Sequence, residues 1–193
     1  MTLRIIATDY ISLDGVIQDP VGMENSGLGD WTGPFGRGPE GDRLKHDELL
    51  AASALILGRL TYDGFAAVWP HVHDPKGFAD RINLLPKHVA SRTLRDPQWR
   101  NTSIIEGDLV QAVRDLKERA DDGDILIYGS ASIVHQLIPH GLVDEFRLMI
   151  YPVVLGRGVR LFPQAHALRL TLTDQRRLGD GIVHLTYVPA AHP

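Results

Sequence analysis

The sequence predicts an α/β fold in which a mixed, mostly parallel sheet is closed by antiparallel strands near the C-terminal end. Short apolar and β-branched runs alternate with helical patterns through the first two-thirds of the chain, which is typical of parallel strands joined by helices. From residue 142 onward the pattern is that of strands alone. Gly179, Asp180 and Gly181 separate two alternating segments there, as a hairpin turn does. We therefore expect parallel strands first and an antiparallel hairpin last.

Composition restricts the class of protein. The chain has 193 residues, of which 44% are hydrophobic and 23% are charged. These values suit a globular domain, and residues 1–193 are expected to form a single one. The formal charge is −4 and the basic residues are scattered, so there is no electrostatic case for a nucleic-acid or membrane partner.

Cysteine and leader signals bear on the compartment. The chain has no cysteine, which excludes disulfides, thiol nucleophiles and cysteine metal sites. No leader precedes the first strand pattern, and the longest apolar run, at 49–57, is too short to span a bilayer. We expect a cytoplasmic protein.

The first strand is expected over residues 3–13, where β-branched residues are dense. It ends in a turn at 12–15 that contains Asp14. This residue is either a functional carboxylate at the end of the strand or part of the turn chemistry, because Asp and Gly are both turn formers.

A glycine-rich loop follows at residues 18–41. Loops of this length inside compact domains are usually functional or disordered. Its two large aromatic residues, Trp31 and Phe35, predict a flap that folds over a bound ligand. The alternative is that they attach the loop to the core.

Two junctions in the middle of the chain carry polar residues that suit a phosphate. A helix is expected at 39–52 and a buried strand at 54–57. The chain then enters a short helix through the first polar turn, which consists of Gly58, Arg59 and Thr61. After a short helix at 78–85, a strand at 87–93 ends in the second polar turn, which consists of Ser91, Arg92 and Thr93. Guanidinium and hydroxyl groups together bind phosphate well, although a solvated strand end is the alternative for the second turn.

The third junction follows two further elements. A strand at 102–105 precedes a helix that begins with a capping box of Asp108 and Gln111 and that ends at Gly123. A buried strand at 125–128 then leads into the third polar turn, made of small residues before another helix: Gly129, Ser130, Ala131 and Ser132. Such a turn lets a phosphate approach the backbone. The alternative is an ordinary turn with Ser130 or Ser132 as the N-cap.

The remaining strands are expected at 142–155, 168–172 and 182–188. One weak metal motif stands between the first two polar turns, where His71, His73 and Asp74 lie close together in sequence. No third spaced ligand accompanies the pair of histidines, so we expect no metal site.

The three polar turns are expected to meet in space. Each of them follows a strand, and ligands in sheets of this kind bind outside the carboxyl ends of the strands. One such turn is weak support for phosphate binding, whereas three in this order are stronger.

The chain resembles dihydrofolate reductase and the C-terminal reductase domain of bifunctional riboflavin-biosynthesis enzymes. It is most similar to the stand-alone bacterial proteins called dihydrofolate reductase family proteins. The resemblance covers nearly the whole chain, and it rests on the following segments: 12–15, 57–62, Gly64 with Phe65, Trp69 with Pro70, 91–93, 128–131, 142–145, 155–158, and Leu161 with Phe162. It implies a three-layer α/β/α fold of the dihydrofolate reductase type.

The resemblance also implies NADPH as the cofactor. In such reductases, the turns that match Gly58, Arg59 and Thr61 hold the cofactor phosphates. The strand end that matches Ser91, Arg92 and Thr93 contacts the 2′-phosphate. The glycine turn that matches residues 129–132 receives the pyrophosphate.

The substrate side departs from both named relatives. Dihydrofolate reductase carries an acidic residue at the start of the helix after its first loop, a place that either Glu40 or Asp42 fills here. Riboflavin reductases typically carry an acidic residue just before the glycine turn, where this chain has Tyr128.

The function expected from these observations is an NADPH-dependent oxidoreductase that reduces a small heterocyclic (pterin- or pyrimidine-like) or carbonyl substrate by hydride transfer. Asp14, Glu40 and Asp42 are the candidates for the proton source, and Tyr10, Trp31 and Phe35 are the candidates for contact with the substrate. The alternative is a nucleotide- or pterin-binding module that kept the fold without turnover. The apolar run at 146–155 and the strand-rich tail further predict a homodimer.

Overall fold

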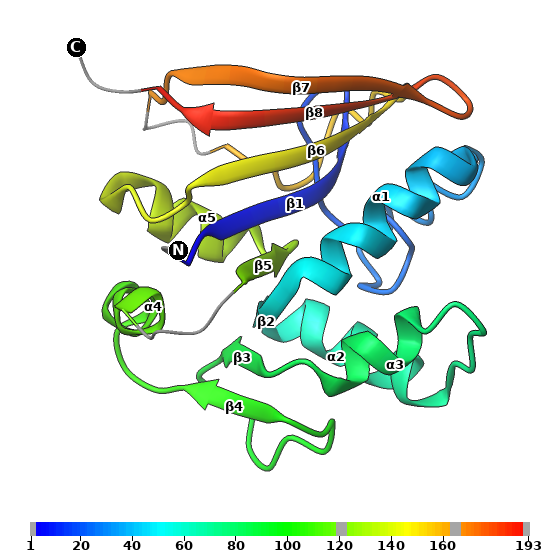
Figure 1. Ribbon diagram of the computed structural model, residues 1–193. Helices are drawn as coiled ribbons and strands as arrows, with labels where there is room; N and C mark the ends of the chain where they lie inside the picture. Colours follow the sequence, from blue (N-terminus) through cyan, green and yellow to red (C-terminus); the bar gives the residue numbers. More distant parts are fainter. Residues whose placement is uncertain (1–2, 119–122, 163–166, 191–193) are drawn as a thin grey trace.

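The structure is a computed structural model that describes residues 3–118, 123–162 and 167–190 (Figure 1). Its strands, in chain order, are β1 (Ile5–Ser12), β2 (Ala52–Gly58), β3 (Lys87–Ala90), β4 (Thr102–Ile105), β5 (Asp124–Tyr128), β6 (Glu145–Tyr151), β7 (Leu170–Leu178) and β8 (Ile182–Pro189). Its helices are α1 (Gly38–Ala51), α2 (Arg59–Val68), α3 (Phe78–Leu84), α4 (Leu109–Glu118) and α5 (Ala131–Leu137), with single 3₁₀ turns η1 (Trp69–His71) and η2 (Ile138–His140).

One eight-stranded sheet runs through the molecule in the order β4-β3-β2-β5-β1-β6-β8-β7. All neighbours from β4 to β6 are parallel, whereas β8 is antiparallel to both β6 and β7. The mostly parallel sheet with an antiparallel hairpin at one edge is therefore confirmed. The hairpin turn at Gly179–Gly181 is confirmed too, since Leu178 pairs with Ile182.

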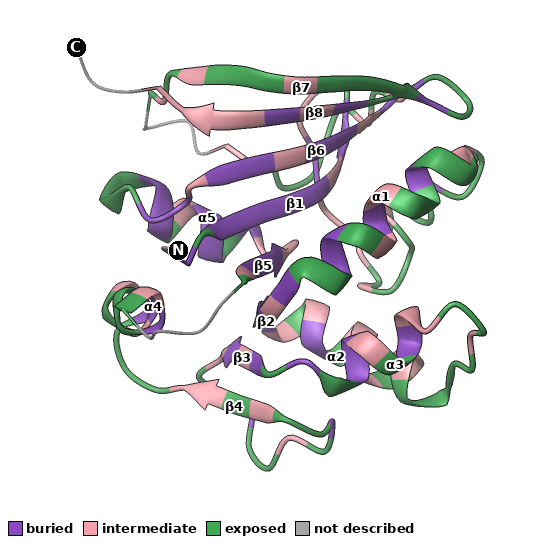
Figure 2. Ribbon diagram, in the orientation of Figure 1, coloured by how far each residue is buried: buried purple, intermediate pink, exposed green. Residues whose placement is uncertain are grey.

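Helices cover both faces of the sheet, so the predicted three-layer arrangement is confirmed (Figure 1). Residues Ile5 and Ala7 of β1 pack with α4 and α5 on one face. Ile6 points to the other face, where Leu49 of α1 and Tyr62 of α2 pack with it. Neighbouring residues of β1 thus enter different cores because side chains alternate along a strand. The central strands are buried, whereas the edge strand β7 is largely exposed (Figure 2).

Several predicted boundaries were wrong, for local reasons. The strand expected at 142–155 ends at Tyr151, because Pro152 has no amide hydrogen to continue a ladder. The strand expected at 168–172 continues to Leu178 through a register shift between Leu172 and Asp174. Its polar side chains hide it from a hydrophobic pattern. β3 ends at Ala90, which leaves the second polar turn outside the strand.

Caps at two helices also bear on the predictions. The Oδ1 atom of Asp108 accepts a hydrogen bond from the Gln111 amide at 2.8 Å, as half of a capping box does, but the Gln111 side chain donates to Asp115 instead of completing the box. Ser130 occupies the N-cap position of α5, yet its side chain does not cap that helix.

The neighbouring strands β1 and β5 separate at a defined point. Their last pair is Thr8 with Tyr128, and β1 then continues to Ser12 beside β6 alone. Asp9 is therefore the first residue of β1 without a partner on β5. This separation opens the centre of the sheet at its carboxyl edge.

Candidate functional site

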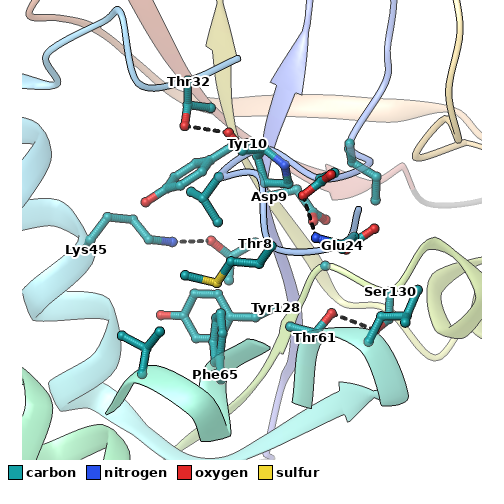
Figure 3. A pocket seen from close by; sticks show the side chains of 18 of the residues that line it. Thr8, Asp9, Tyr10, Glu24, Thr32, Lys45, Thr61, Phe65, Tyr128 and Ser130 are labelled. Atoms are coloured by element: carbon teal, nitrogen blue, oxygen red, sulfur yellow. Dashed lines mark hydrogen bonds between the residues drawn. The ribbon is translucent and has the colours of Figure 1, made fainter. Parts of the chain in front are cut away.

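A cavity of about 1630 Å³ lies along the carboxyl edge of the central strands. All three polar turns line it, together with the first strand, α1, α2 and the loop that follows β1. The predicted meeting of the three turns is thus found in the structure. Figure 3 shows Thr61 and Ser130 on one side of the cavity, and Lys45, Tyr10 and Tyr128 on the other.

The first and third polar turns are packed directly against each other. The Gly58 amide donates a hydrogen bond to the Oγ atom of Ser130 at 2.6 Å, and the Thr61 and Ser130 hydroxyls lie 3.3 Å apart. A Cβ atom on Gly58 would collide with the Ser130 Oγ atom, so only glycine permits this approach. Ser130 itself adopts a left-handed conformation with φ of 61°. The contact fixes two backbone turns as one wall of the cavity.

The second polar turn is held by its own serine. The Ser91 Oγ atom accepts hydrogen bonds from the amides of Thr93 at 3.2 Å and Leu94 at 2.9 Å. The turn starts from β3, whose Lys87 side chain is fully buried and donates to three backbone carbonyl groups below the turn. Arg92 and Thr93 line the cavity beside the first turn.

The other half of the cavity is lined by aromatic and charged groups. Tyr10 of β1 hydrogen-bonds through its hydroxyl to the Arg37 guanidinium, which also pairs with Asp42 of α1 at 2.9 Å. Lys45 places its Nζ atom 5.7 Å from the centre of the Tyr10 ring and 4.8 Å from that of Tyr128. This half therefore offers aromatic faces together with a fixed cation.

A buried polar network under α1 closes the floor of the cavity. The Glu48 Oε1 atom accepts hydrogen bonds from Lys45 at 2.6 Å, from Thr8 at 3.0 Å and from the Tyr128 hydroxyl at 3.3 Å. Burial and the neighbouring Glu48 carboxylate raise the pKa of Tyr128 well above its ordinary value. The Tyr128 hydroxyl is thus a neutral donor at physiological pH. Sequence reasoning missed this network, although the i,i+3 spacing of Lys45 and Glu48 beside the apolar Leu49 was a usable signal.

The site also contains a buried carboxyl that sequence reasoning missed. Asp9 is 6% exposed, lines the cavity, and its Oδ2 atom has no hydrogen-bond partner among the described residues. Burial raises the pKa of Asp9 to about 7, against the attraction of Lys45 and hydrogen bonding from the Gly129 backbone, which lower it. The sequence did contain a signal for it, because Asp9 is an acidic residue inside a strand that was predicted to be buried.

Three predicted site residues lie elsewhere. The Asp14 carboxylate accepts hydrogen bonds from Ser12, Leu155 and Gly156, and these bonds lower its pKa to about 2; it belongs to the turn. Glu40 is exposed and faces Arg176 of β7 at 3.8 Å. Neither of these acids lines the cavity, whereas Asp42 does.

Trp31 requires the third correction. It is 6% exposed and packs edge-on against Tyr151, and its indole nitrogen donates to the Gln18 carbonyl oxygen at 2.9 Å. It attaches the loop to the core and does not line the cavity, as the alternative interpretation expected. Phe35 and Tyr10 do line it.

The weak metal motif is part of a turn. The Asp74 carboxylate accepts hydrogen bonds from the amides of Lys76 and Ala79. Within residues 3–118, 123–162 and 167–190, no group of three or more histidine, aspartate or glutamate side chains is placed to hold a metal ion. Nor does any helix in those ranges have the length and apolar character needed to cross a bilayer.

The chain matches a known protein family over most of its length. Residues 4–184 match the family described as the RibD C-terminal domain. Two curated relatives come from Bacillus subtilis strain 168. The uncharacterized protein YyaP is 32% identical over 189 residues, covering 95% of this chain and 94% of YyaP. The uncharacterized protein YwjB is 28% identical over 192 residues, covering 93% of this chain and 94% of YwjB.

Solved structures show the same fold at low sequence identity. A putative riboflavin biosynthesis protein from Shewanella sp. PV-4 superposes with a TM-score of 0.75 at 21% identity, covering 98% of this chain and all of that one. A pyrimidine reductase-like protein from Corynebacterium diphtheriae has a TM-score of 0.65 at 17% identity, covering 98% of this chain and 93% of that one. Dihydrofolate reductase from Enterococcus faecalis, in a complex with NADP(H), has a TM-score of 0.58 at 15% identity, covering 99% of this chain and 100% of that one. The resemblance drawn from sequence motifs is confirmed.

Proposed function

The chain belongs to the RibD C-terminal domain family, and from that premise we propose that it is an NADPH-dependent reductase of a small heterocyclic (pterin- or pyrimidine-like) or carbonyl substrate. The family and the fold support an oxidoreductase. The cofactor and the substrate class are proposed from the residues of the cavity.

The observation that carries the proposal is the convergence of the three polar turns on one cavity. Arg59 and Thr61, Ser91 to Thr93, and Gly129 to Ser132 come from three separate strand ends, and all of them line the same cavity. Their hydroxyl, guanidinium and backbone amide groups are hydrogen-bond donors to phosphate oxygens. A dinucleotide carries phosphate groups at several separate points. Three separate turns that line one cavity can therefore each bind a different phosphate group.

The residues present fit NADPH. The close approach of Gly58 to Ser130 leaves a wall without bulky side chains, and the first amides of α2 are not capped by a side chain. Thr61, Ser130 and the backbone at Gly129 would hold the pyrophosphate. Arg92, with Ser91 and Thr93, would hold the 2′-phosphate. When bound, NADPH supplies the hydride, and the chain supplies binding, orientation and control of protons.

The opposite half of the cavity would take the substrate. The rings of Tyr10, Phe35 and Phe65 line it and would contact a flat heterocycle. Lys45, fixed by Glu48 and Thr8, would face a carbonyl or ring oxygen. Asp42 remains the candidate acid from α1, because it lines this half whereas Asp14 and Glu40 do not.

Binding and turnover are tested separately. The fluorescence of NADPH should change when NADPH binds to the purified protein. The affinity of the protein for NADPH should exceed its affinity for NADH. A panel of pteridines, aminopyrimidines, flavins and small carbonyl compounds should then contain at least one substrate that accelerates NADPH oxidation. Binding of NADPH with no oxidation across the panel would instead indicate a binding module, and no binding at all would contradict the proposal.

A further inference from the structure

The geometry around Asp9 points to a role that the proposed function does not assign. We propose that Asp9 takes up a proton when an anionic dinucleotide binds to the three polar turns, so that the loaded site carries a carboxylic acid O–H that faces the cavity. The inference rests on the proposed function, because NADPH is the dinucleotide considered.

The position of Asp9 places it between the two halves of the cavity. It follows Thr8, the last residue of β1 that pairs with β5. Tyr10 points toward α1, and adjacent side chains of a strand point to opposite faces, so Asp9 points to the other face. Both residues nevertheless line the same cavity. The cavity therefore passes through the gap between β1 and β5, and Asp9 lies at that passage.

One oxygen of the Asp9 carboxyl lacks the hydrogen-bond partner that a buried acid normally has. Its residue is more than nine-tenths buried, and its Oδ2 atom has no hydrogen-bond partner among the described residues. A buried polar atom left in this way costs free energy unless a bound group satisfies it. A neutral carboxylic acid avoids most of that cost, and it also provides a donor that a carboxylate lacks.

The charges near Asp9 come from three elements. α1 contributes Lys45, which lowers the pKa of Asp9, and Glu48, which raises it. The loop after β1 contributes Asp19 and Glu24, and α2 contributes Arg59, all of which line the same cavity. The neighbour on β6 is Leu148, which carries no charge. No described side chain forms an ion pair with Asp9, so the protonation of its carboxyl is free to respond to a charged ligand.

An anionic ligand on the third polar turn would lie next to this carboxyl, because the Gly129 backbone interacts with Asp9. Bringing negative charge near a carboxylate favours its protonated form. Burial already raises the pKa of free Asp9 to about 7, and a bound pyrophosphate would raise that pKa further. Proton uptake from solvent and dinucleotide binding then strengthen each other by linkage.

The test is the pH dependence of NADPH affinity above neutral pH. The 2′-phosphate has lost its second proton there, since the second pKa of a phosphate monoester is about 6. For the wild-type protein, the dissociation constant should rise with pH above about 7 by up to tenfold per pH unit, the limit for one coupled proton. In Asp9→Asn, whose amide imitates the neutral acid in shape, the dissociation constant should stay constant over the same range.

Two further measurements keep the proposal open to contradiction. Glu24→Gln is the matched control, because Glu24 lines the same cavity and burial also raises its pKa; it should keep the wild-type pH dependence. Titration calorimetry of the wild-type protein at a pH about one unit above 7, in buffers of different ionisation enthalpy, should show uptake of close to one proton per NADPH bound. This measurement needs no variant to fold.

The outcomes are distinguishable. NADPH binding with a constant affinity above neutral pH, with no proton uptake, or with the same pH dependence in Asp9→Asn, would overturn the role of Asp9 and leave the proposed function standing. Absence of NADPH binding at every pH would overturn both.

Discussion

The Oγ atom of Ser130 accepts a hydrogen bond from the Gly58 amide at 2.6 Å, and this contact joins two turns that belong to different strand–helix units. Glycine is required at residue 58 because a larger residue would collide with Ser130, and the serine hydroxyl is required because it accepts the hydrogen bond. The wall formed in this way should be sensitive to one added methyl group.

We expect Gly58→Ala to lower the free energy of unfolding by about 1–3 kcal/mol, as overpacking does, and to weaken NADPH binding by roughly tenfold or more. Ser130→Gly in the same chain should restore much of the stability, because it removes the colliding hydroxyl and because glycine accepts the left-handed backbone of residue 130. It should restore NADPH binding only in part, because the lost Ser130 hydroxyl is also proposed to hold the pyrophosphate. Urea unfolding and NADPH titration of the single and double variants measure the coupling. Strict additivity would contradict the proposed contact.

Arg92→Ala should separate the two nicotinamide dinucleotides. Loss of a charge-assisted bond to the 2′-phosphate should weaken NADPH binding by about ten- to hundredfold, whereas NADH, which lacks that phosphate, should change by less than about twofold. Arg169→Ala is the control, because Arg169 is exposed and is absent from the cavity lining. An equal loss of affinity for both dinucleotides would exclude a 2′-phosphate contact at Arg92.

Lys87→Met should destabilise the fold. The Lys87 Nζ atom donates to the carbonyl oxygens of Asn83, Leu85 and Arg100 at 3.0, 2.7 and 3.1 Å. Methionine would remove all three bonds. The Asn83 carbonyl keeps a hydrogen bond from the Arg100 Nε atom at 3.1 Å, whereas the Leu85 and Arg100 carbonyls lose this donor, at a cost of about 2 kcal/mol or more. Urea unfolding measures this loss, with the exposed Lys76→Met as control.

The loss at Lys87 should also depend on pH. Burial, assisted by the Arg100 charge, lowers the pKa of Lys87 to about 8, whereas an unfolded lysine has a pKa of about 10.4. Between these values the unfolded chain binds more protons, so this group adds stability as the pH rises. The difference in stability between wild type and Lys87→Met should therefore grow from about pH 8 to about pH 10. A difference that shrinks with pH would contradict the lowered pKa.

Two aromatic residues of the loop should behave differently. Trp31→Ala should lower the free energy of unfolding by about 3–5 kcal/mol, because it empties a buried site against Tyr151. Phe35→Ala should affect the unfolding free energy less and the turnover of a substrate more, because Phe35 is half-buried and lines the cavity. Thermal unfolding and kinetics of both variants give the comparison. If Trp31→Ala instead reduced turnover more than stability, Trp31 would have to contact the ligand.

The chain should form a homodimer. β7 pairs only with β8 among the described strands, and Leu172 and Val183 are 44% and 37% exposed on the hairpin that the two strands form. A long edge strand with exposed apolar residues is commonly covered by a partner. Light scattering at micromolar concentration should give about twice the chain mass of 21.4 kDa. A Leu172→Glu variant should shift the mass toward the monomer, and a wild-type monomer would contradict the prediction.

The sequence predicted the parts of this protein that depend on local signals. The polar turns were found because glycine, serine and arginine stand next to apolar strands, and their meeting followed from the rule that parallel strands end at one edge. Asp9 was not predicted, because its place at the cavity depends on the separation of β1 and β5 after Thr8. No local sequence pattern indicates that separation. Asp14, Glu40 and Trp31 were misplaced for a related reason: the side chain of an acid or an aromatic residue in a turn, a loop or the first turn of a helix can face the cavity, the core or solvent, and tertiary packing decides which.

The three polar turns have a consequence for how this protein is made. They stand in the chain near residues 58, 91 and 129, and the strands before them pair in the order β3-β2-β5. No contiguous fragment that ends before β5 contains all three turns, and a nascent chain cannot complete the wall until its third turn has left the ribosome. If the proposed function holds, dinucleotide capture should therefore begin only after β5 and the third polar turn have been made.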